Sequence, residues 1–338
     1  RETIGEFDAA EASADKALSL EQNLPYAQFI KLRAEIRKDA KQALARLERL
    51  ELAASNPDSQ RMVFSWRGLT HDTLRKYDKA AESFKQMAAR PLAQHPLPPI
   101  FPAGTNDNAD IAGTLLWAPA GSRLEVVLQA LQPLLDKRLL IDRNMANARM
   151  DGFGHSRGNP GSPQAGTAGT WQAAIEAQGL EPEAVVDWIP HFDGYTVSEL
   201  KGIRTVALVS DPRDALINWM VFGSAQGFRF HPDETISADW LAQTLEAFVD
   251  HLEKNPDTTS LVKIDNLDST ASSVAMALQS ALALEQAPDE KILSMKVRSR
   301  GGFDNQFPAG HWRNYRGSYQ SAFDRLTPVA VRLGYSAE

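Results

Sequence analysis

Residues 208–219 read Leu-Val-Ser-Asp-Pro-Arg-Asp-Ala-Leu-Ile-Asn-Trp, and this stretch decides the fold. The apolar run Thr205–Val209 predicts a buried strand, and the polar turn that follows leads into a helix. Asp211 is placed to cap that helix, and Pro212 suits its first position. A strand that ends in such a turn is typical of anion sites in α/β proteins, because the helix N-terminus offers free backbone N–H groups.

The same strand–helix alternation extends from Ile111 to the C-terminus. The expected strands are 111–117, 138–141, 185–189, 205–209 and 261–264. The expected helices are 124–135, 196–201, a helix from 212, 238–252, 269–284 and 318–333. This alternation predicts an α/β domain with a central parallel sheet covered by helices on both faces. Ligands of such sheets bind beyond the carboxyl ends of the strands.

The first 90 residues are rich in Ala, Leu, Glu, Lys and Arg and predict helices throughout. The pattern Phe7-Asp8-Ala9-Ala10 returns as Tyr77-Asp78-Lys79-Ala80, two periods of roughly 35 residues later. The last copy is the clearest and contains Trp66, Gly68, Tyr77, Ala80, Phe84 and Pro91. It resembles the tetratricopeptide repeat (TPR), in which small residues lie where two helices cross. An unrelated helical bundle with the same Ala/Leu periodicity is the alternative.

A proline-rich break separates the two halves. The prolines are Pro91, Pro96, Pro98, Pro99 and Pro102. They cannot continue a helix. We therefore expect a helical repeat domain over residues 1–95 and an α/β domain over 96–338.

Composition excludes several classes of protein. The 338 residues carry a formal net charge of -7 and include no cysteine, which argues against nucleic-acid binding and excludes thiol chemistry and disulfides. No apolar run approaches the roughly 20 residues that span a bilayer, no signal peptide is visible, and no His, Asp or Glu cluster has metal-ligand spacing. We expect a cytoplasmic protein without a metal and without membrane or nucleic-acid partners.

The first strand of the α/β domain runs into residues 118–123, Ala-Pro-Ala-Gly-Ser-Arg, and then a helix. This small-residue turn can present N–H groups to a phosphate, although it lacks the Walker A spacing. With residues 187–190 (Asp-Trp-Ile-Pro), 211–214 (Asp-Pro-Arg-Asp) and 310–314 (Gly-His-Trp-Arg-Asn), it resembles the sulfotransferases that use the sulfate donor PAPS.

The resemblance implies a P-loop-like three-layer α/β fold with PAPS (3′-phosphoadenylyl sulfate) as co-substrate and no metal. The residues that it assigns to the donor are Ala120, Gly121, Ser122, Arg123, Ser210, Arg213, Asn218, Arg298, Arg300, Gly301 and Trp312. The family pattern is not complete. The donor turn lacks its basic residue, Trp188 replaces a lysine, and Ser210 and Asn218 stand where the family has arginine and serine. Serine and amide side chains hydrogen-bond phosphate without the charged, bidentate grip of arginine.

Sulfuryl transfer needs a base for the acceptor and positive charge near the moving group. The candidates are His155, His311 and Arg123. The first hypothesis is a bacterial-type TPR-fused sulfotransferase that acts on a hydroxyl of a glycan, peptide or small molecule, with a protein or glycan acceptor bound through the TPR groove. The alternative is a diverged sulfotransferase-fold protein that acts as a TPR binding module. Truncated repeat arrays also pack end to end, so a homo-oligomer is compatible with the sequence.

Overall fold

A computed structural model of the protein describes residues 1–90, 96–103, 112–140, 167–199, 201–295 and 301–338. The chain divides into two compact units. The first unit comprises residues 1–93 together with 296–307 and 313–320, and the second comprises 94–295, 308–312 and 321–338. The sequence placed a boundary at residue 95. The sequence pattern did not predict that residues 296–307 and 313–320 belong to the first unit.

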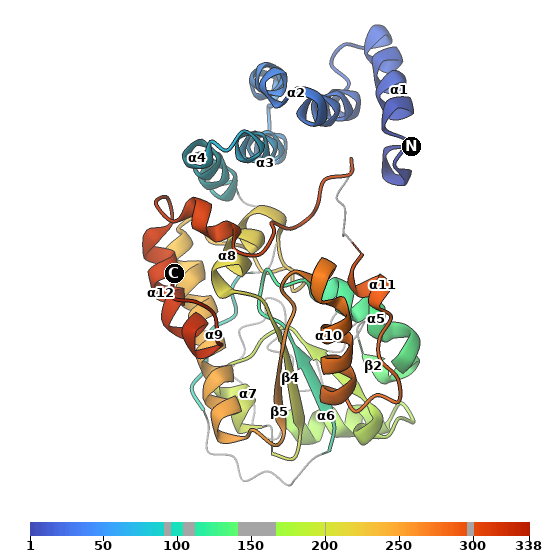
Figure 1. Ribbon diagram of the computed structural model, residues 1–338, viewed down its shortest axis with the longest axis vertical. Helices are drawn as coiled ribbons and strands as arrows, with labels where there is room; N and C mark the ends of the chain where they lie inside the picture. Colours follow the sequence, from blue (N-terminus) through green and yellow to red (C-terminus); the bar gives the residue numbers. More distant parts are fainter. Residues whose placement is uncertain (91–95, 104–111, 141–166, 200, 296–300) are drawn as a thin grey trace. The chain divides into compact units, whose positions relative to one another are not determined.

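The first unit is built on four helices that follow one another along the chain (Figure 1). They are α1 (Phe7–Leu20), α2 (Pro25–Ala53), α3 (Pro57–Thr73) and α4 (Tyr77–Ala88). The backbone of α2 is non-helical at Asp39, where two helices meet across a kink. Helical segments therefore begin at Phe7, after Asp39 and at Tyr77, close to the spacing of the sequence repeat.

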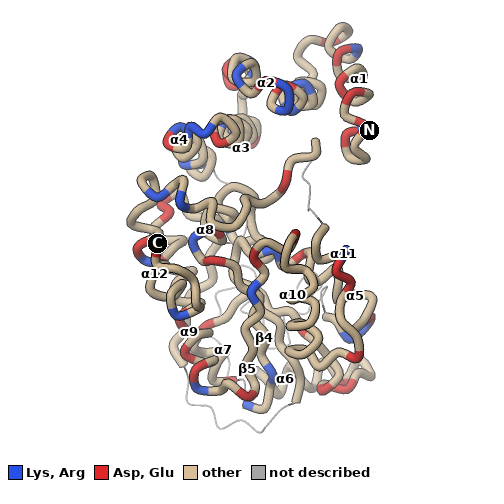
Figure 2. Tube along the Cα trace, viewed as in Figure 1, with Lys and Arg blue, Asp and Glu red and all other residues tan. Residues whose placement is uncertain are grey.

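Small residues allow α3 and α4 to pack closely. A Cβ added to Gly68 would lie inside van der Waals distance of the buried Phe84 ring. Ion pairs join α1 to α2, since Lys31 contacts Glu11 at 2.8 Å and Lys38 contacts the same carboxylate at 2.5 Å. These bonds lower the pKa of Glu11 to about 2. Figure 2 shows acidic and basic residues together on these helices.

The second unit contains a five-stranded, all-parallel sheet. Its strands are β1 (Thr114–Trp117), β2 (Leu139–Leu140), β3 (Val186–Ile189), β4 (Arg204–Val209) and β5 (Thr259–Lys263), in the order β2-β3-β1-β4-β5. The central strands are buried, and β1 pairs with both neighbours over its whole length. The expected α/β class and parallel sheet are confirmed.

Helices cover both faces of this sheet (Figure 1). One layer contains α5 (Leu124–Leu135), α10 (Leu267–Ala281) and α11 (Glu290–Leu293), and the other contains α8 (Pro212–Phe222), α9 (Glu234–Lys254) and α12 (Gln320–Arg332). Arg325 and Arg332 of α12 form ion pairs with acidic residues of α9 at 2.6 Å. Trp117 of β1 lies against Phe192 and against Phe248 of α9, with ring centroids 5.2 and 5.7 Å apart.

Three short helices differ from the sequence prediction. Helices α6 (Thr167–Glu176) and α11 were not predicted, and α7 (Gly194–Ser198) begins earlier than the expected 196–201. Asp193 explains the start of α7, because its side chain accepts a hydrogen bond from the backbone N–H of Thr196. No described helix is both long enough and apolar enough to span a membrane.

We predict that Gly68→Ala destabilises the first unit by about 1–3 kcal/mol, because the buried Phe84 ring has no room to move away from the added carbon. Gly169→Ala is the matched control. It is also a helical glycine, but nothing lies within 4 Å of an added Cβ there. Gly169→Ala should leave the free energy of unfolding unchanged or raise it by up to about 1 kcal/mol. Equal effects of the two variants in urea unfolding would contradict the close packing of α3 on α4.

Candidate functional site

The strand order places a topological switch point at the carboxyl ends of β1 and β4. These strands are neighbours, yet the chain leaves β1 through α5 towards β2 at one edge and leaves β4 through α8 and α9 towards β5 at the other. In open parallel sheets, ligands bind in the crevice formed where adjacent connections diverge in this way. The turns 118–123 and 210–213 both lie at this position.

The two turns contact each other. The hydroxyl oxygens of Ser122 and Ser210 are 3.4 Å apart, and both side chains are buried. Gly121 has φ +85°, and a Cβ there would collide with the carbonyl oxygen of Ala215 in α8. The turn after β1 therefore needs glycine both for its backbone conformation and for its close packing on α8.

The turn after β4 holds a buried ion pair. Asp211 caps α8 by accepting the backbone N–H of Arg213 at 3.0 Å. The same carboxylate accepts the Arg213 guanidinium through Nε at 2.9 Å and Nη2 at 2.7 Å. The Arg213 side chain is fully buried. This bidentate geometry satisfies the pairing that a buried charge requires.

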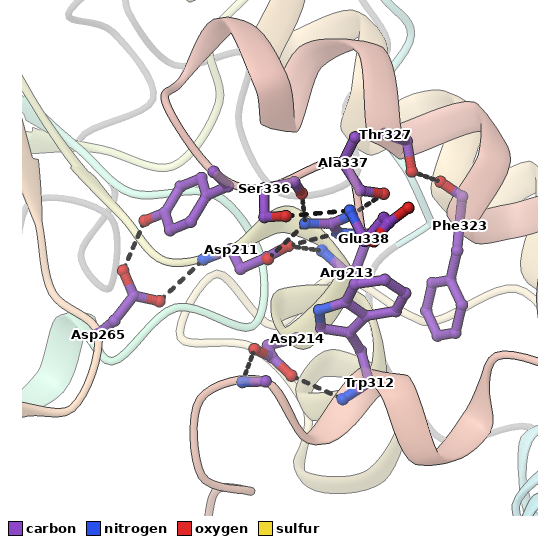
Figure 3. Close-up of polar contacts among 12 residues, drawn as sticks. Asp211, Arg213, Asp214, Asp265, Trp312, Phe323, Thr327, Ser336, Ala337 and Glu338 are labelled. Atoms are coloured by element: carbon purple, nitrogen blue, oxygen red, sulfur yellow. Dashed lines mark hydrogen bonds and ion pairs between the residues drawn. The ribbon is translucent and has the colours of Figure 1, made fainter.

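The remaining donors of Arg213 hold the C-terminal tail (Figure 3). Nη2 donates to the carbonyl of Ser336 at 2.6 Å, and Nη1 donates to that of Ala337 at 3.3 Å. The guanidinium also lies 4.0 Å from the ring centroid of Trp312. Arg213 was expected to bind a phosphate. Its guanidinium instead joins the turn, the tail and Trp312.

Asp214 ties the same turn to the segment that resembles the family's Gly-x-Trp-Arg-Asn element (Figure 3). Its two carboxylate oxygens accept the backbone N–H groups of Gly310 at 2.5 Å and Trp312 at 2.9 Å. These bonds favour the ionised carboxylate, but burial opposes it more strongly and raises the pKa of Asp214 to about 7. Trp312 is buried, and its ring packs edge-on against Phe323 at 5.3 Å.

A second acidic residue follows the neighbouring strand β5. Asp265 accepts the backbone N–H of Asp211 at 3.0 Å and the hydroxyl of Tyr335 at 2.6 Å. Burial raises the pKa of the Asp265 carboxyl. The signal that identifies Asp265 in the sequence is its position directly after an apolar strand, where functional polar side chains gather in parallel sheets.

Several predicted residues lie at the switch point, each with its own surroundings. Ala120 is buried, and Asn218 is buried in the part of α8 that packs against Gly121. Arg123 precedes α5 and donates through Nη2 to the carbonyl of Met295 at 2.8 Å. His311 begins the 3-10 helix η5 (His311–Tyr315) and is partly buried.

Other predicted residues are not part of this cluster. Gly301 belongs to the first unit, where Arg37 of α2 donates to its carbonyl. His155, Arg298 and Arg300 lie outside the described residues. Trp188 lies in β3 and is buried, with 4% of its surface exposed. Among the described residues, no group of three His, Asp or Glu side chains is arranged to hold a metal ion.

The described cluster combines hydroxyls at two helix starts with the carboxyls of Asp214 and Asp265, whose pKa values are raised by burial. It suits hydrogen bonding to an anionic or phosphorylated ligand through backbone N–H and serine hydroxyl groups. No protein-family model matches the chain. A search of curated proteins also found no match.

We predict that Asp214 makes the protein less stable as the pH rises. Its pKa is about 7 when folded, against about 3.9 for an unfolded aspartate. Between these values the folded state keeps a proton that the unfolded state has lost, so the free energy of unfolding falls as the pH rises from about 4 to about 7.

Asp214→Asn removes this titration while resembling the protonated carboxyl. The free energy of unfolding of the wild type minus that of the variant should therefore fall over this range by up to the order of 4 kcal/mol. Urea unfolding at a series of pH values measures it. A difference that stays flat or grows with pH would show that the folded carboxyl is ionised throughout.

We predict that Arg213→Ala is destabilising by about 3–5 kcal/mol, because it leaves the Asp211 carboxylate buried without its partner. Deleting residues 336–338 is the comparison, since it removes the tail carbonyls but keeps the ion pair. It should cost less than Arg213→Ala in thermal unfolding. Near-native stability of Arg213→Ala would contradict the structural role.

Proposed function

We propose that the protein is a TPR-containing sulfotransferase that transfers a sulfuryl group from PAPS to a hydroxyl of a glycan, peptide or small molecule. The observation that carries the proposal is the Asp214 carboxylate, which binds the backbone of Gly310 and Trp312. Two segments that resemble the family separately in sequence are thereby joined at one place. That place is also the switch point at which parallel sheets bind ligands.

The two turns would supply the contacts to the donor. The backbone of residues 120–122, at the start of α5, would bind the phosphosulfate end, where a helix N-terminus favours negative charge. Ser210 and Asn218 would hydrogen-bond the 3′-phosphate, and Arg123 would add positive charge. Bound PAPS supplies an activated sulfuryl group. The acceptor oxygen forms a bond to sulfur, the bond from sulfur to the phosphate oxygen breaks, and 3′,5′-ADP leaves. His155 or His311 would take the acceptor's proton.

A second candidate is a sulfotransferase-fold binding module without transferase activity. The hydrogen bonds of Arg213 favour this binding module. Its guanidinium contacts Asp211 and two backbone carbonyls in the part of the site that should hold a phosphate.

We predict saturable binding of 3′,5′-ADP to the full chain, with a Kd of about micromolar order in calorimetry. Ser210→Ala should weaken it by about tenfold or more, because it removes a hydrogen bond to a charged group. Ser273→Ala is the matched control, as its exposed hydroxyl bonds only the carbonyl of Thr270 in α10. It should leave the Kd unchanged.

Release of 3′,5′-ADP from PAPS with a panel of hydroxyl acceptors then separates the two candidates. Binding with transfer supports the enzyme. Binding without transfer to any acceptor favours the module. No binding at millimolar 3′,5′-ADP would exclude PAPS as the donor.

A further inference from the structure

We infer that helices α1–α3, together with Glu2 of the 3-10 turn before α1, form a binding site for a Gly-Gly-Phe peptide, and that the chain fills it with its own residues 301–303. The residues that form this Gly-Gly-Phe site are Glu2, Phe7, Arg33, Arg37 and Trp66. All of them belong to the first unit, as does the segment that they contact. The inference does not depend on the donor proposed above.

Gly301 occupies the polar end of the site. The Arg37 guanidinium donates to its carbonyl, and a Cβ there would meet the Arg33 side chain and a carboxylate oxygen of Glu2. The position of Arg33 is fixed by a bidentate pair with Glu2, at 2.9 Å through Nε and 2.5 Å through Nη2. Gly301 has φ +89°, so this position excludes other residues both by space and by backbone conformation.

Gly302 lies on an aromatic floor. A Cβ at this position would lie inside van der Waals distance of the Phe7 ring, and φ is +79°. The Arg37 guanidinium lies 4.4 Å from the centroid of the same ring. Arg37 therefore packs on the Phe7 ring and also binds the carbonyl of Gly301. Position 302 requires glycine for the same two reasons as position 301, space and backbone conformation.

Phe303 occupies the apolar end. Its ring meets Trp66 edge-on, with centroids 5.4 Å apart at 73°, and the Arg37 guanidinium lies 5.8 Å from its centroid. It packs against the buried cluster of the repeat helices, which consists of Leu32, Ile36, Ala43, Leu47 and Val63. Burial of an aromatic ring at such a site provides most of the affinity in peptide recognition, whereas the glycines provide selectivity.

A second set of contacts keeps the segment attached. The Tyr315 hydroxyl donates to Asp72 at 2.6 Å, and the Tyr319 hydroxyl donates to the carbonyl of Ala81 at 3.1 Å. Attachment on the C-terminal side gives residues 301–303 a high effective concentration at the site, of about millimolar or above. An acceptor or partner protein that used this face of the helices would have to displace them.

We predict that amide exchange of residues 301–307 in the full chain is slow and becomes at least about tenfold faster in Phe303→Ala and in Gly302→Ala. Asn305→Ala is the matched control, because Asn305 is an exposed residue of the same segment. It should leave the exchange unchanged. Protection of α1–α4 in the same experiment reports whether the repeat helices stay folded. Should Phe303→Ala loosen these helices, Gly302→Ala keeps the test, since it leaves the Phe303 ring in place and its added carbon meets the Phe7 ring first.

A labelled peptide of residues 301–306, Gly-Gly-Phe-Asp-Asn-Gln, tests the site in trans. We expect saturable binding to full-length Phe303→Ala or Gly302→Ala and at least about tenfold weaker binding to the wild type, whose site is already filled. The control peptide with alanine in place of the second glycine should not bind. Unchanged exchange in both variants, or equal binding of the two peptides, would overturn the inference.

Discussion

The Asp214 carboxylate fixes the arrangement on which the second unit depends. It stands in the first turn of α8, directly after the central strand β4, and accepts two backbone N–H groups from a segment almost a hundred residues away. These bonds orient the backbone of Gly310 and Trp312, because each oxygen of the one carboxylate accepts one of the two N–H groups. Trp312 is thereby held under the Arg213 guanidinium, and Arg213 in turn holds the C-terminal tail.

Burial of these charges has a cost that shapes the chemistry of the site. Arg213 is stable inside the unit because Asp211 neutralises it and two backbone carbonyls accept two of its remaining donors. The Nη1 and Nη2 edge of the guanidinium faces the carbonyls of Ser336 and Ala337, which a ligand would have to displace to bind there. The charge of Arg213 is thus used in contacts within the second unit.

Local sequence patterns predicted those parts of the molecule that depend on near neighbours. Helix α5 has the bounds that the apolar spacing indicated, and α8 begins at Pro212 behind its aspartate cap, because periodicity, proline and capping act within a few residues. Ser122 and Ser210 lie close together at the carboxyl ends of neighbouring parallel strands, where such sheets bind ligands, but the sequence pattern did not predict their contact. The contacts of Asp265 with Tyr335 and of Arg213 with Ser336 join residues 70 and 123 positions apart, and no local pattern contains them.

Gly301 and Gly302 show why motif resemblance alone assigns such residues ambiguously. A Gly-Gly pair indicates a backbone with positive φ or the close approach of another group. It does not state what approaches. The resemblance to sulfotransferases predicted a nucleotide beside Gly301. The described neighbours of the two glycines are Arg33 of α2 and Phe7 of α1. Residues 308–312 belong to the second unit but are joined at both ends to residues of the first. Along the chain, the contacts of Phe303 and Tyr315 with α3 therefore precede and follow the stretch that Asp214 binds.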